Sequence, residues 1–258
     1  MRATTVLPLL GVVLLCSCGS RVAREMGEMV SGKPPSAVFL LVDVSISTAS
    51  TRVQEQARKD FATILDVWSK RGGQLRGDVI GADVLNRATV PLRVAVPAFN
   101  AVTSDSDYHE KKVLRPALAQ ANEQFGQLLA TKPATKTEIL NALSVAAKVF
   151  NGEEWREAHR KALVIFSDMV EESDLYDFKT DRLDDRRIAA IIEAERVAGR
   201  LPALQGVRVW KAGSAAGAIP EEKLRQIEKF WLQYFQAAGA VFPKERYAAA
   251  VLDFALQW

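Results

Sequence analysis

Cysteine, histidine and an excess of either charge are all scarce in this chain. Its 258 residues include two cysteines, Cys16 and Cys18, and two histidines. The 34 lysines and arginines nearly balance the 31 acidic residues, which leaves a net charge of +3. A small secreted protein held together by disulfides has cysteines throughout its body, and a disordered chain has few apolar residues or a large net charge. The composition therefore excludes both classes, and its weak charge indicates no nucleic-acid partner.

Long apolar runs are scarce as well. The mean hydropathy is −0.01, whereas a protein that crosses a membrane several times needs repeated apolar segments of about 20 residues. Hydrophobic residues still make up 48% of the chain. This is enough for one globular domain with a full core.

The first 20 residues are typical of a secretion signal. An apolar run at residues 6–15 follows Arg2 and is too short to cross the ~30 Å hydrocarbon core of a bilayer. The tetrapeptide at residues 15–18, Leu-Cys-Ser-Cys, resembles a bacterial lipobox, in which Leu stands three residues before the acylated Cys. The resemblance implies a signal peptide at 1–17, cleavage before Cys18, and lipid on the Cys18 sulfur.

The same resemblance places the protein in the bacterial cell envelope, facing the periplasm or the cell surface. The residue after Cys18 is Gly19 rather than Asp, which favours the outer membrane. The alternatives are a plain signal peptide with incidental cysteines and an uncleaved anchor. Residues 18–36 are polar, contain glycine and proline, and are expected to form a tether. Residues 37–258 are expected to form the folded body.

The body alternates predicted strands with predicted helices. Continuous apolar runs indicate strands buried on both faces, and apolar residues three or four apart indicate helices. Such alternation predicts an α/β fold with a mostly parallel sheet that helices cover on both faces. The predicted strands are residues 37–42, 78–85, 89–96, 162–166 and 207–210, the helices are 51–70, 108–130 (interrupted near Pro116), 138–150, 186–198 and 221–238, and 247–254 is a strand or a helix.

Side chains with oxygen donors follow the predicted buried strands. Asp43, Ser45 and Ser47 come directly after the first strand, Asp168 follows a later one, and Thr137 opens a helix between them. Ligands of such sheets bind beyond the carboxyl ends of the strands. An all-oxygen donor set suits Mg²⁺, with Mn²⁺ or Ca²⁺ as alternatives. With so few protein donors the cation would keep an open position, which would attract an acidic residue of a partner.

These motifs resemble the metal-ion-dependent adhesion site (MIDAS) of the von Willebrand factor A (VWA) domain family. The resemblance covers residues 36–240 and implies a Rossmann-like, VWA-type three-layer sandwich, with a mostly parallel central sheet flanked by helices and one short antiparallel edge strand. It implies Mg²⁺ held directly by Ser45 and Ser47, directly or through water by Thr137, and mainly through water by Asp43 and Asp168.

Two residues depart from the family pattern. Lys136 precedes Thr137 and Met169 follows Asp168, where the family often has glycine. A lysine there would place a positive charge beside the metal and weaken its binding.

Two further groups of residues can each be interpreted in two ways. Trp231 and Tyr234 lie on the last long helix at core spacing, and the alternative is a docking surface for a partner. Glu171, Glu172 and Asp174 follow the strand that precedes Asp168. They are expected in a solvated loop, with added charge near the metal as the alternative.

The preferred hypothesis from the sequence is a non-enzymatic, lipid-anchored module that binds a protein partner through the metal. A second hypothesis keeps the fold without the metal, as a structural or assembly lipoprotein of the envelope. A third is an envelope hydrolase that uses the same carboxylates. The sequence contains no recognisable pair of nucleophile and base, which argues against the hydrolase.

Overall fold

A computed structural model describes most of the body of the protein. The predicted signal peptide, Cys18 and nearly all of the tether, together with Ser47, lie outside the described residues. The described residues are 36–45, 48, 50–81, 85, 91–97, 105–156, 158–214, 219–251 and 253–257.

The described chain forms a five-stranded sheet with the strand order β3-β2-β1-β4-β5. The pairs β1–β2, β1–β4 and β4–β5 are parallel, and β3 pairs antiparallel with β2 at one edge. The α/β fold class is therefore confirmed, and the antiparallel edge strand implied by the family resemblance is present. The strands are β1 Ser36–Asp43, β2 Gly73–Ile80, β3 Leu92–Val96, β4 Arg160–Phe166 and β5 Arg208–Ala212.

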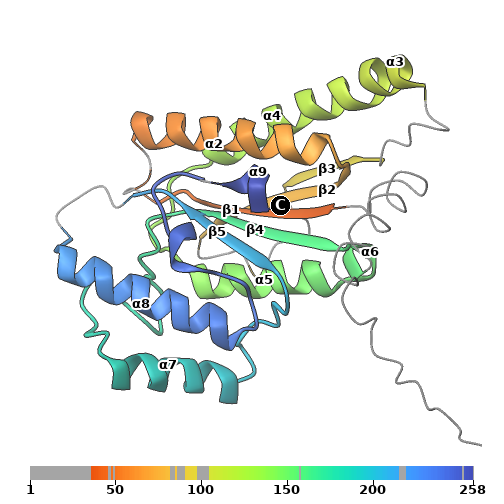
Figure 1. Cartoon of the computed structure of the whole chain (residues 1–258). Helices are drawn as coiled ribbons and strands as arrows, with labels where there is room; N and C mark the ends of the chain where they lie inside the picture. Colours follow the sequence, from red (N-terminus) through yellow and green to blue (C-terminus); the bar gives the residue numbers. More distant parts are fainter. Residues whose placement is uncertain are drawn as a thin grey trace, which may run out of the picture.

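Helices cover both faces of the sheet (Figure 1). One layer consists of α2 Thr51–Ser69, α3 Ser106–Tyr108, η3 His109–Leu114, α4 Arg115–Leu129 and α9 Phe254–Gln257. The other contains α5 Ile139–Asn151, α7 Asp185–Val197 and α8 Glu221–Ala237. The short helices α6 Glu153–Arg156 and η4 Lys244–Arg246 complete the described elements. None of the helices in these ranges combines the length and apolar composition needed to cross a bilayer.

The central strand β1 joins the two halves of the core. All eight of its residues are buried, and successive side chains of a strand point to opposite faces of the sheet. Phe39 and Leu41 pack in the core beside α5 and α8, whereas Leu40 and Val42 pack in the core beside α2 and α4. The continuous apolar run that predicted this strand is thus explained by burial on both faces.

The second strand differs most clearly from its predicted bounds. The second strand was predicted at 78–85, but β2 begins at Gly73 and ends at Ile80. Gly72 and Gly73 have φ angles of 71° and 114°, which glycine adopts at low cost. They turn the chain from α2 directly into β2, so the strand starts earlier than its apolar pattern suggests.

The C-terminal segment 247–254 is not a regular edge strand. It makes a single parallel bridge between Tyr247 and Lys211 of β5, and α9 begins at Phe254. The interruption predicted near Pro116 is present as the π-helical segment η3 immediately before α4. Proline has no N–H to donate to the preceding turn, which accounts for the change of helix type there.

Replacing Gly73 with alanine is expected to destabilise the protein strongly. A Cβ at Gly73 would lie 2.0 Å from the carbonyl oxygen of Ser36, so β1 and β2 would have to separate. We expect the free energy of unfolding in urea to fall by about 3 kcal/mol. Gly199 is the matched control, because it has a φ of 67° and no atom lies within 4 Å of the point that a Cβ would occupy. Gly199→Ala should cost about 1 kcal/mol, and equal losses for both variants would contradict this account.

Candidate metal site

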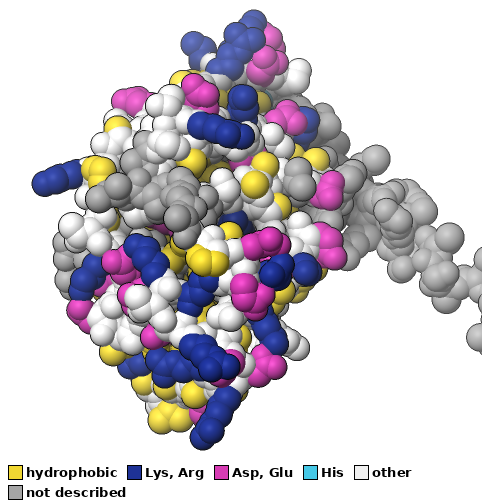
Figure 2. All heavy atoms as spheres, turned by 90° about the vertical axis from the view of Figure 1, so that its left-hand side faces the viewer, with side chains coloured by type: hydrophobic (Ala, Val, Ile, Leu, Met, Phe, Trp, Pro, Cys, Tyr) yellow, Lys and Arg dark blue, Asp and Glu magenta, His cyan; other side chains and the backbone are white. Residues whose placement is uncertain are grey.

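The candidate site lies at the carboxyl ends of two adjacent parallel strands. Asp43 is the last residue of β1, and Ser167 and Asp168 directly follow β4. This end of the sheet is on the left of Figure 1 and faces the viewer in Figure 2, where Lys and Arg side chains lie among acidic ones. The sequence-based expectation that residues after β1 and β4 lie together is met because the two strands pair in register.

The Asp43 carboxylate is buried and held from two sides. Asp43 is only 5% exposed to solvent. Its Oδ1 accepts a hydrogen bond from the Ser45 backbone N–H at 2.8 Å, and its Oδ2 accepts one from the Ser167 hydroxyl at 2.7 Å. The Ser167 Oγ in turn accepts the Met169 N–H at 2.9 Å. These bonds leave the carboxylate oriented at the strand end with lone pairs still available on each oxygen.

The turn after β1 is closed by Thr48, which was not among the predicted ligands. Its Oγ1 lies 2.8 Å from the Asp43 carbonyl oxygen and 3.0 Å from that of Ser45, and its N–H donates to Ser45 O at 3.1 Å. Ser45 Oγ lies 3.5 Å from Thr48 Oγ1. A threonine three residues after a serine in a turn is the signal that could have predicted this closure.

The loop that carries Thr137 contacts the loops after both strands. Thr137 and Glu172 exchange two backbone hydrogen bonds of 3.1 and 3.0 Å, and Ala134 N–H donates to Val44 O at 3.1 Å. The N-cap residue of α5 is Glu138, so Thr137 lies just before the helix. The structure thus brings Asp43, Ser45, Thr137 and Asp168 to one end of the sheet.

The electrostatics of this arrangement favour a cation. Burial, and next the negative charge of Asp168, raise the pKa of Asp43 to about 6. Two like charges in a buried place repel each other, and a divalent cation between them would relieve this repulsion. In the described residues no group of three or more His, Cys, Asp or Glu side chains is placed to hold a metal. The candidate set instead combines two carboxylates with Ser and Thr hydroxyls, which are donors that Mg²⁺ and Mn²⁺ accept.

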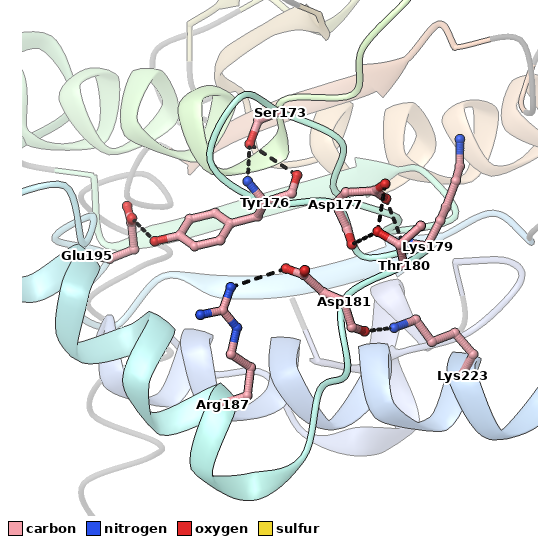
Figure 3. A network of polar contacts seen from close by, with 9 residues as sticks. All are labelled: Ser173, Tyr176, Asp177, Lys179, Thr180, Asp181, Arg187, Glu195 and Lys223. Carbon is pink, nitrogen blue, oxygen red and sulfur yellow. Dashed lines mark hydrogen bonds and ion pairs between the residues drawn. The ribbon is translucent and has the colours of Figure 1, made fainter.

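The segment between β4 and α7, which carries Asp168, has little regular structure but is fixed by polar contacts (Figure 3). Tyr176 OH donates to Glu195 of α7 at 2.8 Å. Arg187, also of α7, donates to Asp181 at 3.4 Å, and Lys223 of α8 donates to the Asp181 carbonyl. The segment is therefore tied to both helices beneath it.

Glu171 in this segment is buried, and the expectation that it lies in a solvated loop was wrong. The residue is 1% exposed, and its Oε2 accepts the Leu140 N–H at 3.1 Å. It thereby satisfies one of the free N–H groups at the start of α5. Burial raises the pKa of Glu171 to about 8, so the carboxyl group is mostly uncharged at neutral pH. It adds no full negative charge to the candidate site.

The two departures from the family pattern have structural explanations. Lys136 forms an ion pair with Asp174, so its positive charge is already partnered. Met169 has a φ of 65°, which normally favours glycine. Its carbonyl oxygen accepts the Trp231 indole N–H at 2.8 Å, and this contact fixes the strained residue.

Trp231 and Tyr234 are fully buried. This confirms the prediction that they belong to the core and rules out the alternative that they form a docking surface.

A cleft lies beside the candidate site on the α2 side of the sheet. It has a volume of about 790 Å³ and lies between α2, residues 129–133 and the ends of β1, β4 and β5. Asp43 and Ser167 line it, whereas the described ligands Ser45, Thr137 and Asp168 do not. Asp43 therefore lies between the cleft and the other candidate ligands.

No protein-family model matches the chain, and no curated protein matches it. Among solved structures, the manganese-loaded TRAP protein of Plasmodium vivax is 17% identical over 76% of this chain and 63% of that one, with a TM-score of 0.41. The pilus adhesin SpaC of Lactobacillus rhamnosus GG in its open conformation is 13% identical over 84% of this chain and 29% of that one, with a TM-score of 0.42. The chain thus spans less than two thirds of either protein. These likenesses are too distant to assign a family or a function.

Replacing Asp43 with asparagine is expected to stabilise the metal-free protein at neutral pH. The pKa of Asp43 is raised to about 6 in the folded state, so its charged form destabilises folding. This cost is absent below about pH 4 and complete above about pH 6. In EDTA, Asp43→Asn should raise the free energy of unfolding by about 2 kcal/mol at pH 7.5 and leave it nearly unchanged at pH 4.

The control is Asp66→Asn, because the Asp66 side chain is 64% exposed and should matter little at either pH. Urea unfolding of both variants at the two pH values measures the difference. A loss of stability in Asp43→Asn at pH 7.5 would contradict a charged Asp43 carboxylate that destabilises the metal-free fold.

Proposed function

We propose that this protein is a lipid-anchored binding module of the bacterial cell envelope that captures a protein partner through a divalent cation. The observation that carries the proposal is the pairing of β1 with β4, which places Asp43 and Asp168 at one end of the sheet. Burial, and next the charge of Asp168, raise the pKa of the Asp43 carboxyl group. Cation binding is the simplest use of two buried carboxylates surrounded by hydroxyl groups.

In this proposal the metal is Mg²⁺, with Mn²⁺ or Ca²⁺ as alternatives. Asp43, Ser45, Thr137 and Asp168 would hold it, together with Ser47, which lies outside the described residues. The cation supplies a hard positive centre with an open position, which suits a carboxylate of the partner. The residues of this chain hold the carboxylates in place and limit their contact with water.

The arrangement around Ser167 favours binding over catalysis. The Ser167 hydroxyl donates to Asp43, so Ser167 is the candidate nucleophile of a hydrolase. It is 1% exposed, and its Oγ is engaged by both Asp43 and the Met169 N–H. An activated nucleophile needs access to the substrate and a base that can take its proton. The buried Ser167 lacks this access.

Removal of the Asp43 carboxylate is expected to weaken cation binding strongly. Isothermal calorimetry with Mn²⁺ should show binding to the wild-type protein and at least about a tenfold weaker affinity in Asp43→Ala. Asp60→Ala is the matched control, because Asp60 is also 5% exposed but lies on α2. Its affinity for Mn²⁺ should be that of the wild type. Equal affinities in Asp43→Ala and the wild type would refute the site.

The metal-independent alternative makes a different prediction for partner binding. Once a partner is identified, EDTA should release it from the wild-type protein if the metal bridges the two. A complex that persists unchanged in EDTA, and also forms with Asp43→Ala, would favour a structural or assembly lipoprotein.

The lipid anchor is tested by the two cysteines near the N-terminus. Cys18→Ser should move the protein from the membrane fraction to the soluble fraction of bacterial cells, because the acyl chains provide the membrane affinity. Cys16→Ser is the matched control and should stay in the membrane fraction, since Cys16 is removed with the signal peptide. Membrane retention of Cys18→Ser would contradict the anchor.

A further inference from the structure

A buried lysine lies close to the candidate site and is not among its predicted ligands. Lys211 is 6% exposed and stands on β5. Lys211 pairs across the sheet with Ile165 of β4, and Ile165 pairs with Leu41 of β1. Leu41 and Ile165 face α5 and α8, and side chains two residues apart share a face. Lys211 is therefore on the same face as Asp43 and lies one residue before β5 ends at Ala212.

The Lys211 ammonium group is directed toward the carboxyl end of the sheet. Its Nζ donates a hydrogen bond to the carbonyl oxygen of Gly213, two residues further along, and lies 4.7 Å from the centre of the Tyr247 ring. Gly213 packs so closely on Ser167 that a Cβ there would lie 2.8 Å from the Ser167 carbonyl oxygen. The positive charge is thus fixed beside the backbone that leads into Asp168.

The acidic groups around Lys211 identify its electrostatic partners. Burial lowers the pKa of Lys211 to about 8, while the charges of Asp168 and Glu228 oppose this shift. Glu228 on α8 also forms an ion pair with Lys244 at 3.3 Å. Asp168 is thus the partner of Lys211 that belongs to the candidate site. At neutral pH most of Lys211 carries its positive charge.

We propose that Lys211 is a built-in counter-charge of the Asp43–Asp168 pair and competes with the divalent cation for the field of these carboxylates. The inference rests on the proposed metal site and adds to it a residue that sets its affinity. In the metal-free protein the ammonium group offsets part of the carboxylate repulsion. When the cation binds, the two positive charges repel each other, so Lys211 weakens cation binding.

The test compares Mn²⁺ binding to the wild-type protein and to Lys211→Met by isothermal calorimetry. Methionine keeps the length of the buried side chain without its charge. We expect the dissociation constant for Mn²⁺ to fall by about tenfold. Lys211→Arg keeps the charge and should stay close to the wild type.

Lys161→Met is the matched control from the opposite end of the sheet. Lys161 is a partly buried lysine near the start of β4, and its Nζ donates to the Phe150 carbonyl oxygen at 2.9 Å. Its removal deletes a comparable lysine far from the carboxyl ends of the strands. The affinity for Mn²⁺ should not change in this variant.

A second measurement needs no metal. In EDTA, Lys211→Met should lower the melting temperature more in the wild-type background than in Asp168→Asn, because part of its stabilising effect requires the Asp168 charge. Should Lys211→Met fail to fold, Lys211→Gln serves in both measurements, since its amide keeps a donor without the charge.

The outcomes separate this inference from the proposed function. Tighter Mn²⁺ binding in Lys211→Met, together with coupling to Asp168, supports both. Equal affinities of the wild type and Lys211→Met overturn the role of Lys211 and leave the metal site standing. Absence of Mn²⁺ binding in both proteins overturns the metal site and the competition together.

Discussion

The repulsion between two buried carboxylates is the constraint on which the candidate site depends. Asp43 and Asp168 are brought to one end of the sheet because β1 and β4 are adjacent and parallel. Burial, and next the charge of Asp168, raise the pKa of Asp43, so a charged Asp43 beside Asp168 has a cost in the folded protein. A fold that keeps such a pair gains from any positive charge placed beside it. A bound cation and the Lys211 ammonium group are the two such charges proposed here.

The surroundings of the pair explain how an irregular segment can hold Asp168 in place. Glu171 ties the segment to the start of α5, Thr137 and Glu172 exchange backbone hydrogen bonds, and Trp231 donates to the Met169 carbonyl. These contacts come from the start of α5, from the loop just before it and from α8. Trp231, a buried residue of α8, thereby supports the loop at the carboxyl end of the sheet. This contact links the packing of the core to the geometry of the site.

The sequence was sufficient to predict the fold class and the meeting of the residues after β1 and β4. Both follow from apolar runs and from the rule that parallel strands end at the same edge. The burial of Glu171 and the roles of Thr48 and Lys211 were not predicted. Their partners lie far along the chain or on backbone atoms, and no periodic pattern records such contacts. The start of β2 was missed because the strand begins at Gly73, directly after Gly72, without an apolar run.

The most direct test is a crystal structure of the protein grown with Mn²⁺ and measured at the manganese absorption edge. The account predicts one anomalous density peak among the side chains of Asp43, Ser45, Thr137 and Asp168, within coordination or water-bridging distance of each. A peak elsewhere, or an end of the sheet without one at saturating Mn²⁺, would contradict the metal site.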